Sequence, residues 1–254
     1  MLAEINPANA LIVGASQGIG LGFVRALLEQ DNVESIYATY RSQDTAGELF
    51  NLERQYSDRL KCLQVDITAE SQIAAAIKQI QESVEQLHLA IYCVGVLQDR
   101  NLSPEKSLRQ IDADKLIYSF QVNSIGAVLL AKHLMPLFNK RDRSILACIS
   151  AKVGSIGDNR LGGWYGYRAS KAALNMFLKT TAIEYSRRCP QTIVVALHPG
   201  TTDTRLSQPF QKNVPSAKLF PVEHTVSLLS KVIAGLEIKD SGQFFSWDGT
   251  QLPW

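Results

Sequence analysis

The sequence predicts a single α/β domain built on a doubly wound parallel sheet of roughly seven strands. Short runs rich in Val, Ile and Tyr alternate with longer segments of helical period along the 254 residues, as they do in repeated βα units. No internal repeat and no Pro- or Gly-rich linker divides the chain. The length is ordinary for one α/β domain, and 46% apolar with 20% charged residues is the composition of a folded globule. We therefore treat residues 1–254 as one domain.

Seven runs have the length and the β-branched content of buried strands. They are Ala10–Val13, Ser35–Tyr40, Lys61–Val65, Leu87–Cys93, Ser144–Ile149, Ile193–Leu197 and Gln243–Trp247. Apolar residues recur three and four apart in the segments predicted as helices, which are Gly20–Glu29, Ala69–Glu85, Ile117–Phe138 and Tyr167–Arg188. Two stretches, Gly154–Gly166 and Thr201–Pro221, have no clear period. Long irregular segments in a compact domain are usually functional, so we expect both to border the substrate.

The charge balance argues against several classes of partner. The net charge is +2, with no block of one sign, whereas a nucleic-acid or anionic-membrane surface needs clustered positive charge. No apolar run approaches the ~20 residues of a membrane-spanning helix. The four cysteines form no C-x-x-C pair, which argues against a metal site and a disulfide framework. The first residues lack the pattern of a signal peptide, so we expect a cytoplasmic protein with reduced thiols.

A glycine-rich turn follows the first predicted strand. It reads Gly14-Ala15-Ser16-Gln17-Gly18-Ile19-Gly20, and a helical pattern comes next. Glycines let the backbone approach a pyrophosphate, and the helix presents free N–H groups and the positive end of its dipole. The spacing differs from the usual G-x-G-x-x-G fingerprint, and a purely structural turn is the alternative, but the position between strand and helix favours a dinucleotide. The predicted contacts are Gly14, Ser16, Gln17, Gly18, Ile19 and Gly20.

The end of the second predicted strand bears on the choice of coenzyme. An NAD site has an acidic residue there for the ribose 2′-hydroxyl, whereas this chain reads Ala38-Thr39-Tyr40-Arg41-Ser42. Arg41 can pair with a 2′-phosphate, and no carboxylate is present to repel it. The sequence favours NADP(H) over NAD(H), although Gln17 offers no second cation, and Arg41 as a solvated loop residue is the alternative.

Tyr167 and Lys171 lie four residues apart at the start of a predicted helix, so their side chains share one face. A tyrosine hydroxyl has a reference pKa of about 10, and a neighbouring ammonium favours the phenolate. The pair can therefore control the proton of an alcohol or a carbonyl. Such a spacing is common by chance, so it becomes specific only together with the glycine-rich turn.

With the glycine-rich turn and the Tyr167/Lys171 pair in this order, the sequence resembles the short-chain dehydrogenase/reductase family over essentially its whole length. The resemblance implies a Rossmann domain and further site residues. It assigns Asp66 and Ile67 to the adenine end of the coenzyme, Asn123 to a proton-relay water beside the lysine, and Pro199, Gly200, Thr201 and Thr204 to the nicotinamide amide. Each of these also has a plain structural explanation as a cap or a turn.

Two longer runs are similar to the C-factor and sniffer branch of that family. They are residues 163–175 and the ending Phe244-Phe245-Ser246-Trp247-Asp248-Gly249. The branch contains carbonyl-reductase-like proteins and a bacterial cell–cell signalling protein. The resemblance therefore implies either activity and does not specify a substrate.

The chain departs from the family pattern at two places. Tyr92-Cys93-Val94-Gly95 stands where Asn-Asn-Ala-Gly is usual, and Gly95 keeps the close approach to the coenzyme. The run Ser150-Ala151-Lys152-Val153-Gly154 places Ala151 where the family has its catalytic serine. Ser155 is the favoured substitute, because Ser150 points the opposite way from position 151 if the strand is still extended there; Ser150 or no serine at all are the alternatives.

These observations predict an NADPH-dependent reductase of an aldehyde or ketone. Tyr167 donates the proton, Lys171 lowers the tyrosine pKa and holds the nicotinamide ribose, Ser155 orients the carbonyl and Asn123 connects the site to solvent. The rival is an NADP(H)-binding signalling protein with little turnover, which the missing serine allows; a sugar-nucleotide epimerase or dehydratase is disfavoured by length. The resemblance also implies a homodimer or homotetramer, paired through the helices that contain Asn123 and Tyr167.

Overall fold

A seven-stranded sheet forms the centre of the protein. The computed structural model describes residues 2, 5–99, 101–138 and 142–254. The strand order is β3-β2-β1-β4-β5-β6-β9, with every neighbouring pair parallel. The strands are β1 (Ala8–Val13), β2 (Val33–Tyr40), β3 (Leu60–Gln64), β4 (Leu89–Tyr92), β5 (Ser144–Ile149), β6 (Thr192–His198) and β9 (Gln243–Ser246). The predicted α/β class and the seven parallel strands are confirmed.

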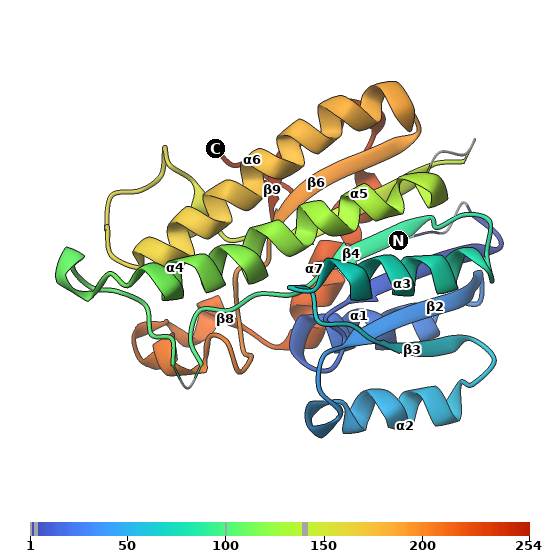
Figure 1. The fold of residues 1–254 in the computed structure, drawn as a ribbon, viewed down its shortest axis with the longest axis horizontal. Coiled ribbons are helices and arrows are strands. Elements are labelled where there is room, and N and C mark those ends of the chain that lie inside the picture. Colours follow the sequence, from blue (N-terminus) through green and yellow to red (C-terminus); the bar gives the residue numbers. More distant parts are fainter. Residues whose placement is uncertain (1, 3–4, 100, 139–141) are drawn as a thin grey trace.

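Helices cover both faces of this sheet (Figure 1). One face carries α3 (Glu70–Gln81), α5 (Gly126–Phe138) and α6 (Tyr165–Arg188), and the other carries α1 (Gly18–Leu28) and α7 (Val222–Gly235). The short α2 (Gly47–Gln55) lies beside β3 at the sheet edge. Each helical layer and the strand face beneath it form one apolar cluster, so the strands are buried on both sides, as a parallel sheet requires.

The predicted helix Ile117–Phe138 is three elements in the structure. These are α4 (Ala113–Phe120), a π-helical turn over Gln121–Ile125, and α5. The buried Tyr92 hydroxyl donates a hydrogen bond of 2.7 Å to the Val122 carbonyl within this turn. A π-turn carries one extra residue and leaves carbonyls without their usual helical partner, so Tyr92 satisfies one of them. Tyr92 stands where the first asparagine of the usual Asn-Asn-Ala-Gly run would be. Its hydroxyl thus links strand β4 to the π-helical turn that contains Asn123.

The second of the two segments predicted to be irregular contains local structure. Strand β7 (Thr201–Thr202) pairs in parallel with β8 (Leu219–Phe220), and short 3-10 turns lie between them. Two helices, α2 and α7, were not predicted, and α7 begins directly after this segment. Among the described residues, no helix is both long and apolar enough to cross a bilayer.

The strand order reverses between β1 and β4, because β1 continues to β2 on one side and the chain crosses to β4 on the other. Doubly wound sheets bind ligands at the carboxyl ends of the strands beside such a switch point. The glycine-rich turn follows β1 and Gly95 follows β4, so the predicted coenzyme contacts lie at this edge.

Candidate active site

The glycine-rich turn between β1 and α1 is shaped by positions that exclude side chains. Gly14 and Gly18 have φ of +83° and +56°, and a Cβ on Gly20 would lie 2.2 Å from the Gly14 carbonyl oxygen. Left-handed backbone of this kind favours glycine. Ser16, Gln17 and Gly18 line one side of an open cleft of about 480 Å³. The N-terminus of α1 is therefore accessible to an anionic group.

The residues predicted for the adenine end lie at neighbouring strand ends. Arg41 follows β2 and is exposed, and the Gln64 amide at the end of β3 donates to the Arg41 carbonyl at 3.1 Å. Asp66 Oδ1 accepts hydrogen bonds from the backbone N–H and the hydroxyl of Thr68 at 2.9 and 2.7 Å. The Ile67 side chain is buried in the core beside Gly126 of α5.

The Tyr167/Lys171 pair lies in the first turns of α6. The Lys171 ammonium is 5.9 Å from the centroid of the Tyr167 ring, and it donates to the Ile149 carbonyl at 2.9 Å. Burial lowers the pKa of Lys171 from 10.5 to about 8 and raises the pKa of Tyr167 well above its ordinary value. The expected lowering of the tyrosine pKa is thus outweighed by burial in the protein itself, because the ammonium is directed at the strand carbonyl.

Asn123 is fully buried and fastens the loop after β4. Its Oδ1 accepts from the Val96 N–H at 2.7 Å, and its Nδ2 donates to the Val96 carbonyl at 2.8 Å and to Ser170 Oγ at 3.0 Å. A Cβ on Gly95 would lie 3.5 Å from both Asn123 Oδ1 and Lys171 Nζ. Gly95, Asn123 and Lys171 therefore meet at one point, next to Tyr167.

The two candidate serines have different partners. The Ser150 hydroxyl is buried and donates a hydrogen bond to Asn175 Oδ1 at 2.7 Å. Its proton is therefore not available to a substrate. Ser155 is also buried, and its Oγ accepts from the Asp158 N–H at 3.1 Å. Because Ser155 is the acceptor in that bond, its own proton remains available for donation. Ala151 is extended and half-buried between them.

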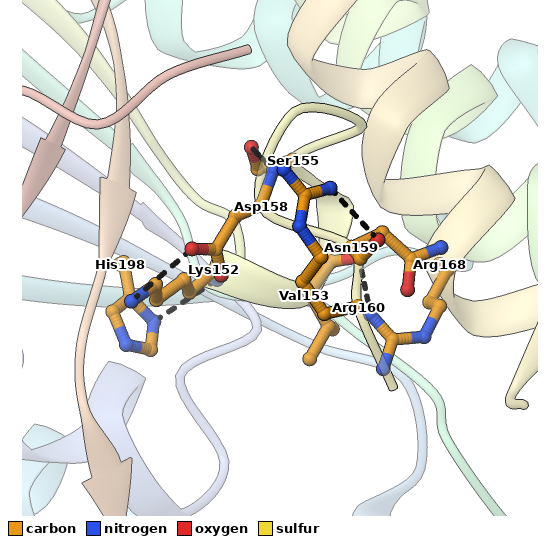
Figure 2. Close-up of polar contacts among 8 residues, drawn as sticks. All are labelled: Lys152, Val153, Ser155, Asp158, Asn159, Arg160, Arg168 and His198. Atoms are coloured by element: carbon orange, nitrogen blue, oxygen red, sulfur yellow. Dashed lines mark hydrogen bonds and ion pairs between the residues drawn. The ribbon is translucent and has the colours of Figure 1, made fainter. Parts of the chain in front are cut away.

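A polar cluster that the sequence analysis missed holds the loop between β5 and α6. Figure 2 shows Lys152, Asp158 and His198 gathered at one end of the loop and Arg168 at the other. The Lys152 N–H donates to His198 Nδ1 at 3.3 Å, and the Lys152 ammonium lies 3.6 Å from Asp158 Oδ1. Burial, together with the Lys152 charge, lowers the pKa of His198 to about 4. A neutral imidazole that accepts at Nδ1 carries its proton at Nε2.

Arg168 fixes the remainder of this loop. Its guanidinium donates to the Gly163 carbonyl at 3.0 Å and to the Val153 carbonyl at 3.3 Å. These two carbonyls are ten residues apart in the sequence. A single side chain on α6 thus holds both ends of the segment that contains Ser155.

Aromatic side chains join the two irregular segments beside Tyr167. The Trp164 ring lies 4.9 Å from Phe210 and 6.3 Å from Tyr167, measured between ring centroids. Trp164 has φ of 52°, a left-handed conformation that costs a bulky residue about 1–3 kcal/mol and persists where surrounding structure holds it, often at functional sites. Trp164, Tyr167 and Phe210 form an aromatic wall on one side of the site.

The loop after β6 returns to the glycine-rich turn. Gly200 has φ of +73°, and a Cβ there would lie 2.8 Å from the Phe220 ring. Thr204 Cγ2 lies 3.3 Å from the position that a Cβ on Gly18 would occupy. The segment Pro199–Thr204 therefore reaches the first turn of α1, as a loop that covers a bound dinucleotide must. No group of three His, Cys, Asp or Glu in the described part of the chain is arranged to hold a metal ion.

A glycine-rich turn at the switch point of a parallel sheet, with a Tyr/Lys pair at the start of α6, defines a class of dinucleotide-dependent oxidoreductases. The model of the short chain dehydrogenase family matches residues 8–215, and the chain belongs to this family. The resemblance inferred from the motifs is confirmed.

Relatives of known structure or sequence include proteins of the expected branch. C-signal of Myxococcus xanthus is 31% identical over 148 residues, which are 58% of this chain and 84% of that protein. The structure of NADPH-bound carbonyl reductase from chicken fatty liver covers 98% of this chain and is itself covered completely, at 28% identity and a TM-score of 0.87. Carbonyl reductase Sniffer of D. melanogaster has the same fold, with 24% identity, a TM-score of 0.85 and coverage of 98% and 100% of the two chains.

Proposed function

We propose that this protein reduces an aldehyde or ketone to an alcohol with NADPH. The convergence of Gly95, Asn123, Lys171 and Tyr167 carries the proposal. A protein that only binds a dinucleotide needs the glycine-rich turn, whereas a buried lysine beside a half-buried tyrosine is unfavourable to maintain and suits proton transfer. The likeness to NADPH-bound carbonyl reductase over nearly the whole chain supports the same reaction.

The residues present fit a dinucleotide. Side chains are excluded at Gly14 and Gly20 in the cradle after β1, and Gly95 leaves the end of β4 without a side chain. Ser16 to Gly20 would hold the pyrophosphate, Asp66 the adenine end, and the Pro199–Thr204 segment the nicotinamide amide. When bound, NADPH supplies a hydride. Arg41 is the group that would pair with the 2′-phosphate, which favours NADPH over NADH.

Each side chain of the site has a separate role in this proposal. Tyr167 donates its hydroxyl proton to the carbonyl oxygen. Lys171 stabilises the phenolate that remains and binds the nicotinamide ribose. Ser155 donates a hydrogen bond to the carbonyl oxygen in place of the serine missing at position 151. Asn123 holds Val96 in place and connects Lys171 to solvent through a water molecule.

The aromatic wall indicates the substrate side. Trp164 and Phe210 pack within 4.9 Å of one another beside Tyr167, and Leu206 lies 3.7 Å from the Cβ position of Gly95. Pockets lined by such groups bind apolar and aromatic molecules. The proposed substrates are therefore apolar or aromatic carbonyl compounds.

One observation favours a second function. The identity with C-signal, together with Ala151 at the place of the catalytic serine, is compatible with an NADP(H)-binding signalling protein of low turnover. Such a protein has no need of a proton-transfer pair, so Lys171 and Tyr167 favour the reductase.

The decisive experiment follows NADPH oxidation by absorbance against a panel of aldehydes, ketones and diketones, with NADH as the comparison. Tyr167→Phe should lower turnover by about 10²- to 10⁴-fold, the usual contribution of a positioned general acid. NADPH binding, measured by fluorescence titration, should stay unchanged in this variant. An inactive wild-type protein that binds NADPH tightly would favour the signalling function. Activity that survives in Tyr167→Phe would overturn the assignment of the proton donor.

The proposal extends to assembly and location. Exposed apolar side chains on α4 to α6 provide a surface through which two copies can pair, as a homodimer or as half of a homotetramer. The four cysteines are free, and Cys148 and Cys189 are buried. Unpaired cysteines are typical of the reducing cytoplasm, where we place the protein.

A further inference from the structure

Glu105 is a buried carboxylate outside the group of residues discussed so far. It lies in the loop between β4 and α4, and only 5% of its area is exposed. Its Oε2 accepts a hydrogen bond of 3.1 Å from the Gly166 N–H in the first turn of α6. Burying a carboxylate is unfavourable unless it is hydrogen-bonded or lies in a favourable field. The start of α6 supplies both.

The catalytic helix needs an acceptor at this end. Its N-cap is Trp164, whose left-handed backbone and indole provide no side-chain cap. The first N–H groups of a helix have no partner within the helix, and the helix dipole favours negative charge there. Glu105 is therefore a cap supplied by a segment about sixty residues away in the sequence.

The sequence of α6 makes room for this carboxylate. A Cβ on Gly166 would lie 2.9 Å from Glu105 Oε1, closer than real Cβ atoms approach. The backbone carbonyl of Glu105 also accepts from the Trp164 N–H at 2.5 Å. Main chain and side chain of one residue thus hold the turn from Trp164 to Gly166, immediately before Tyr167.

The loop that carries Glu105 is fastened at both ends to the site. Near its beginning the Asn123 amide holds both polar atoms of the Val96 backbone, and near its end Glu105 holds the start of α6. Asp99 caps the turn between them by accepting from the N–H groups of Asn101 and Leu102, at 2.8 Å each. The loop therefore connects the helix of Asn123 to the helix of Tyr167.

We propose that Glu105 is a positioning residue for carbonyl reduction: its carboxylate caps α6 from the opposite loop and fixes the left-handed Trp164 turn, so that Tyr167 and the Trp164 ring face the substrate. This inference rests on the reductase function proposed above. Glu105 acts through Gly166 and Trp164 and does not itself contact the reacting atoms.

The test compares Glu105→Ala, Glu105→Gln, Gly166→Ala and the double variant Glu105→Ala/Gly166→Ala in the full-length protein. Glu105→Ala should lower kcat by at least about 10-fold, since misplacement of a catalytic group by 1 Å can cost about 10²-fold. The dissociation constant of NADPH should change much less than kcat, because most of the proposed coenzyme contacts lie on the glycine-rich turn and at strand ends outside α6. Glu105→Gln keeps an acceptor for the Gly166 N–H and should restore most of the turnover. Gly166→Ala should lower kcat in the wild-type background and have a smaller further effect in Glu105→Ala, since the carboxylate is then gone and only Leu116 Cδ2, 3.0 Å from the Cβ position, remains close.

Hydrogen exchange of the Tyr165–Lys171 amides, measured by mass spectrometry, tests the cap independently of turnover. Exchange should be faster in Glu105→Ala and unchanged in Glu105→Gln. Three outcomes would overturn the inference: unchanged exchange in Glu105→Ala, a kcat within twofold of wild type, or a loss of NADPH binding parallel to that of kcat. A wild-type protein that reduces none of the carbonyl compounds would contradict the proposed function alone, and the exchange data would still decide whether Glu105 holds the turn.

Discussion

Lys171 is a buried amine whose ammonium donates to the Ile149 carbonyl, and burial lowers its pKa to about 8. The unfolded chain has an ordinary lysine pKa near 10.4. Between these two values the unfolded chain binds more protons than the folded protein, so the free energy of unfolding rises with pH over that interval. Near pH 7 the buried Lys171 ammonium therefore destabilises the folded protein, and the proposed reaction uses this same charge.

Lys171→Met should abolish most turnover and raise the free energy of unfolding at pH 7. A pKa difference of about two units corresponds to ~3 kcal/mol, from which loss of the hydrogen bond to Ile149 subtracts about 1 kcal/mol. The gain should shrink as the pH rises from 7 to 10, because the wild-type lysine then becomes neutral in the folded state. Urea unfolding at both pH values measures this, with the exposed Lys231→Met as the control. An equal effect of Lys171→Met at both pH values would contradict the argument.

Arg41 is the residue on which the proposed coenzyme preference depends. It is exposed at the end of β2, so its charge is available to a phosphate. Hydrogen bonds to charged groups contribute about 1.5–3 kcal/mol, so Arg41→Ala should weaken NADPH binding by roughly 10- to 100-fold and leave NADH binding unchanged. Fluorescence titration of both coenzymes measures the difference, with Arg54→Ala on α2 as the matched control. An equal loss of affinity for both coenzymes would mean that Arg41 supports the fold and does not bind the 2′-phosphate.

At the scale of the element, the strands and the glycine-rich turn were predictable because their signals are local. A strand buried on both faces is a continuous apolar run, and Gly14 and Gly20 are adjacent to such a run. The break within Gln121–Ile125 was not predictable, because the apolar period continues through it and only the distant Tyr92 hydroxyl marks the turn. Helix α7 was missed because it begins directly after a segment without a clear period.

In the candidate site, too, features with a local signal could be predicted from the sequence, and features that depend on distant residues could not. The Tyr167/Lys171 spacing is a property of one helix and could be recognised in the sequence. The hydrogen bond from Ser150 to Asn175, the hydrogen bond from Arg168 to the Val153 carbonyl and the cap by Glu105 join residues that are 25, 15 and 61 positions apart along the chain. Such pairings arise from packing of whole elements, and no periodicity or spacing reports them. For the same reason the sequence analysis placed Lys171 beside Tyr167 but did not anticipate the hydrogen bond from its ammonium to the Ile149 carbonyl.

At the scale of the molecule, several exposed apolar side chains lie on the helices that we propose to pair between two copies. Four exposed side chains lie on α4, the adjoining π-turn and α6: Ile117, Ile125, Met176 and Ile183, with exposed fractions of 56%, 38%, 66% and 49%. Figure 1 shows α4 and α5 end to end, with α6 alongside them. Single exposed apolar residues are ordinary, but a group of them on adjacent helices is what the proposed pairing of two copies predicts.

Light scattering should therefore give a mass of at least twice the 28.1 kDa of the chain, and Met176→Glu should reduce it to that of one chain. Burying a carboxylate opposite its symmetry mate is unfavourable for both charges. Ile238→Glu, at an apolar residue that is 45% exposed but lies outside this surface, should leave the mass unchanged. A wild-type mass of one chain at all concentrations would contradict pairing.

The dissociated Met176→Glu protein should keep its turnover, because Gly95, Asn123, Tyr167 and Lys171 all come from one chain. Loss of activity on dissociation would mean instead that pairing holds α6, and with it the proposed proton donor Tyr167, in place.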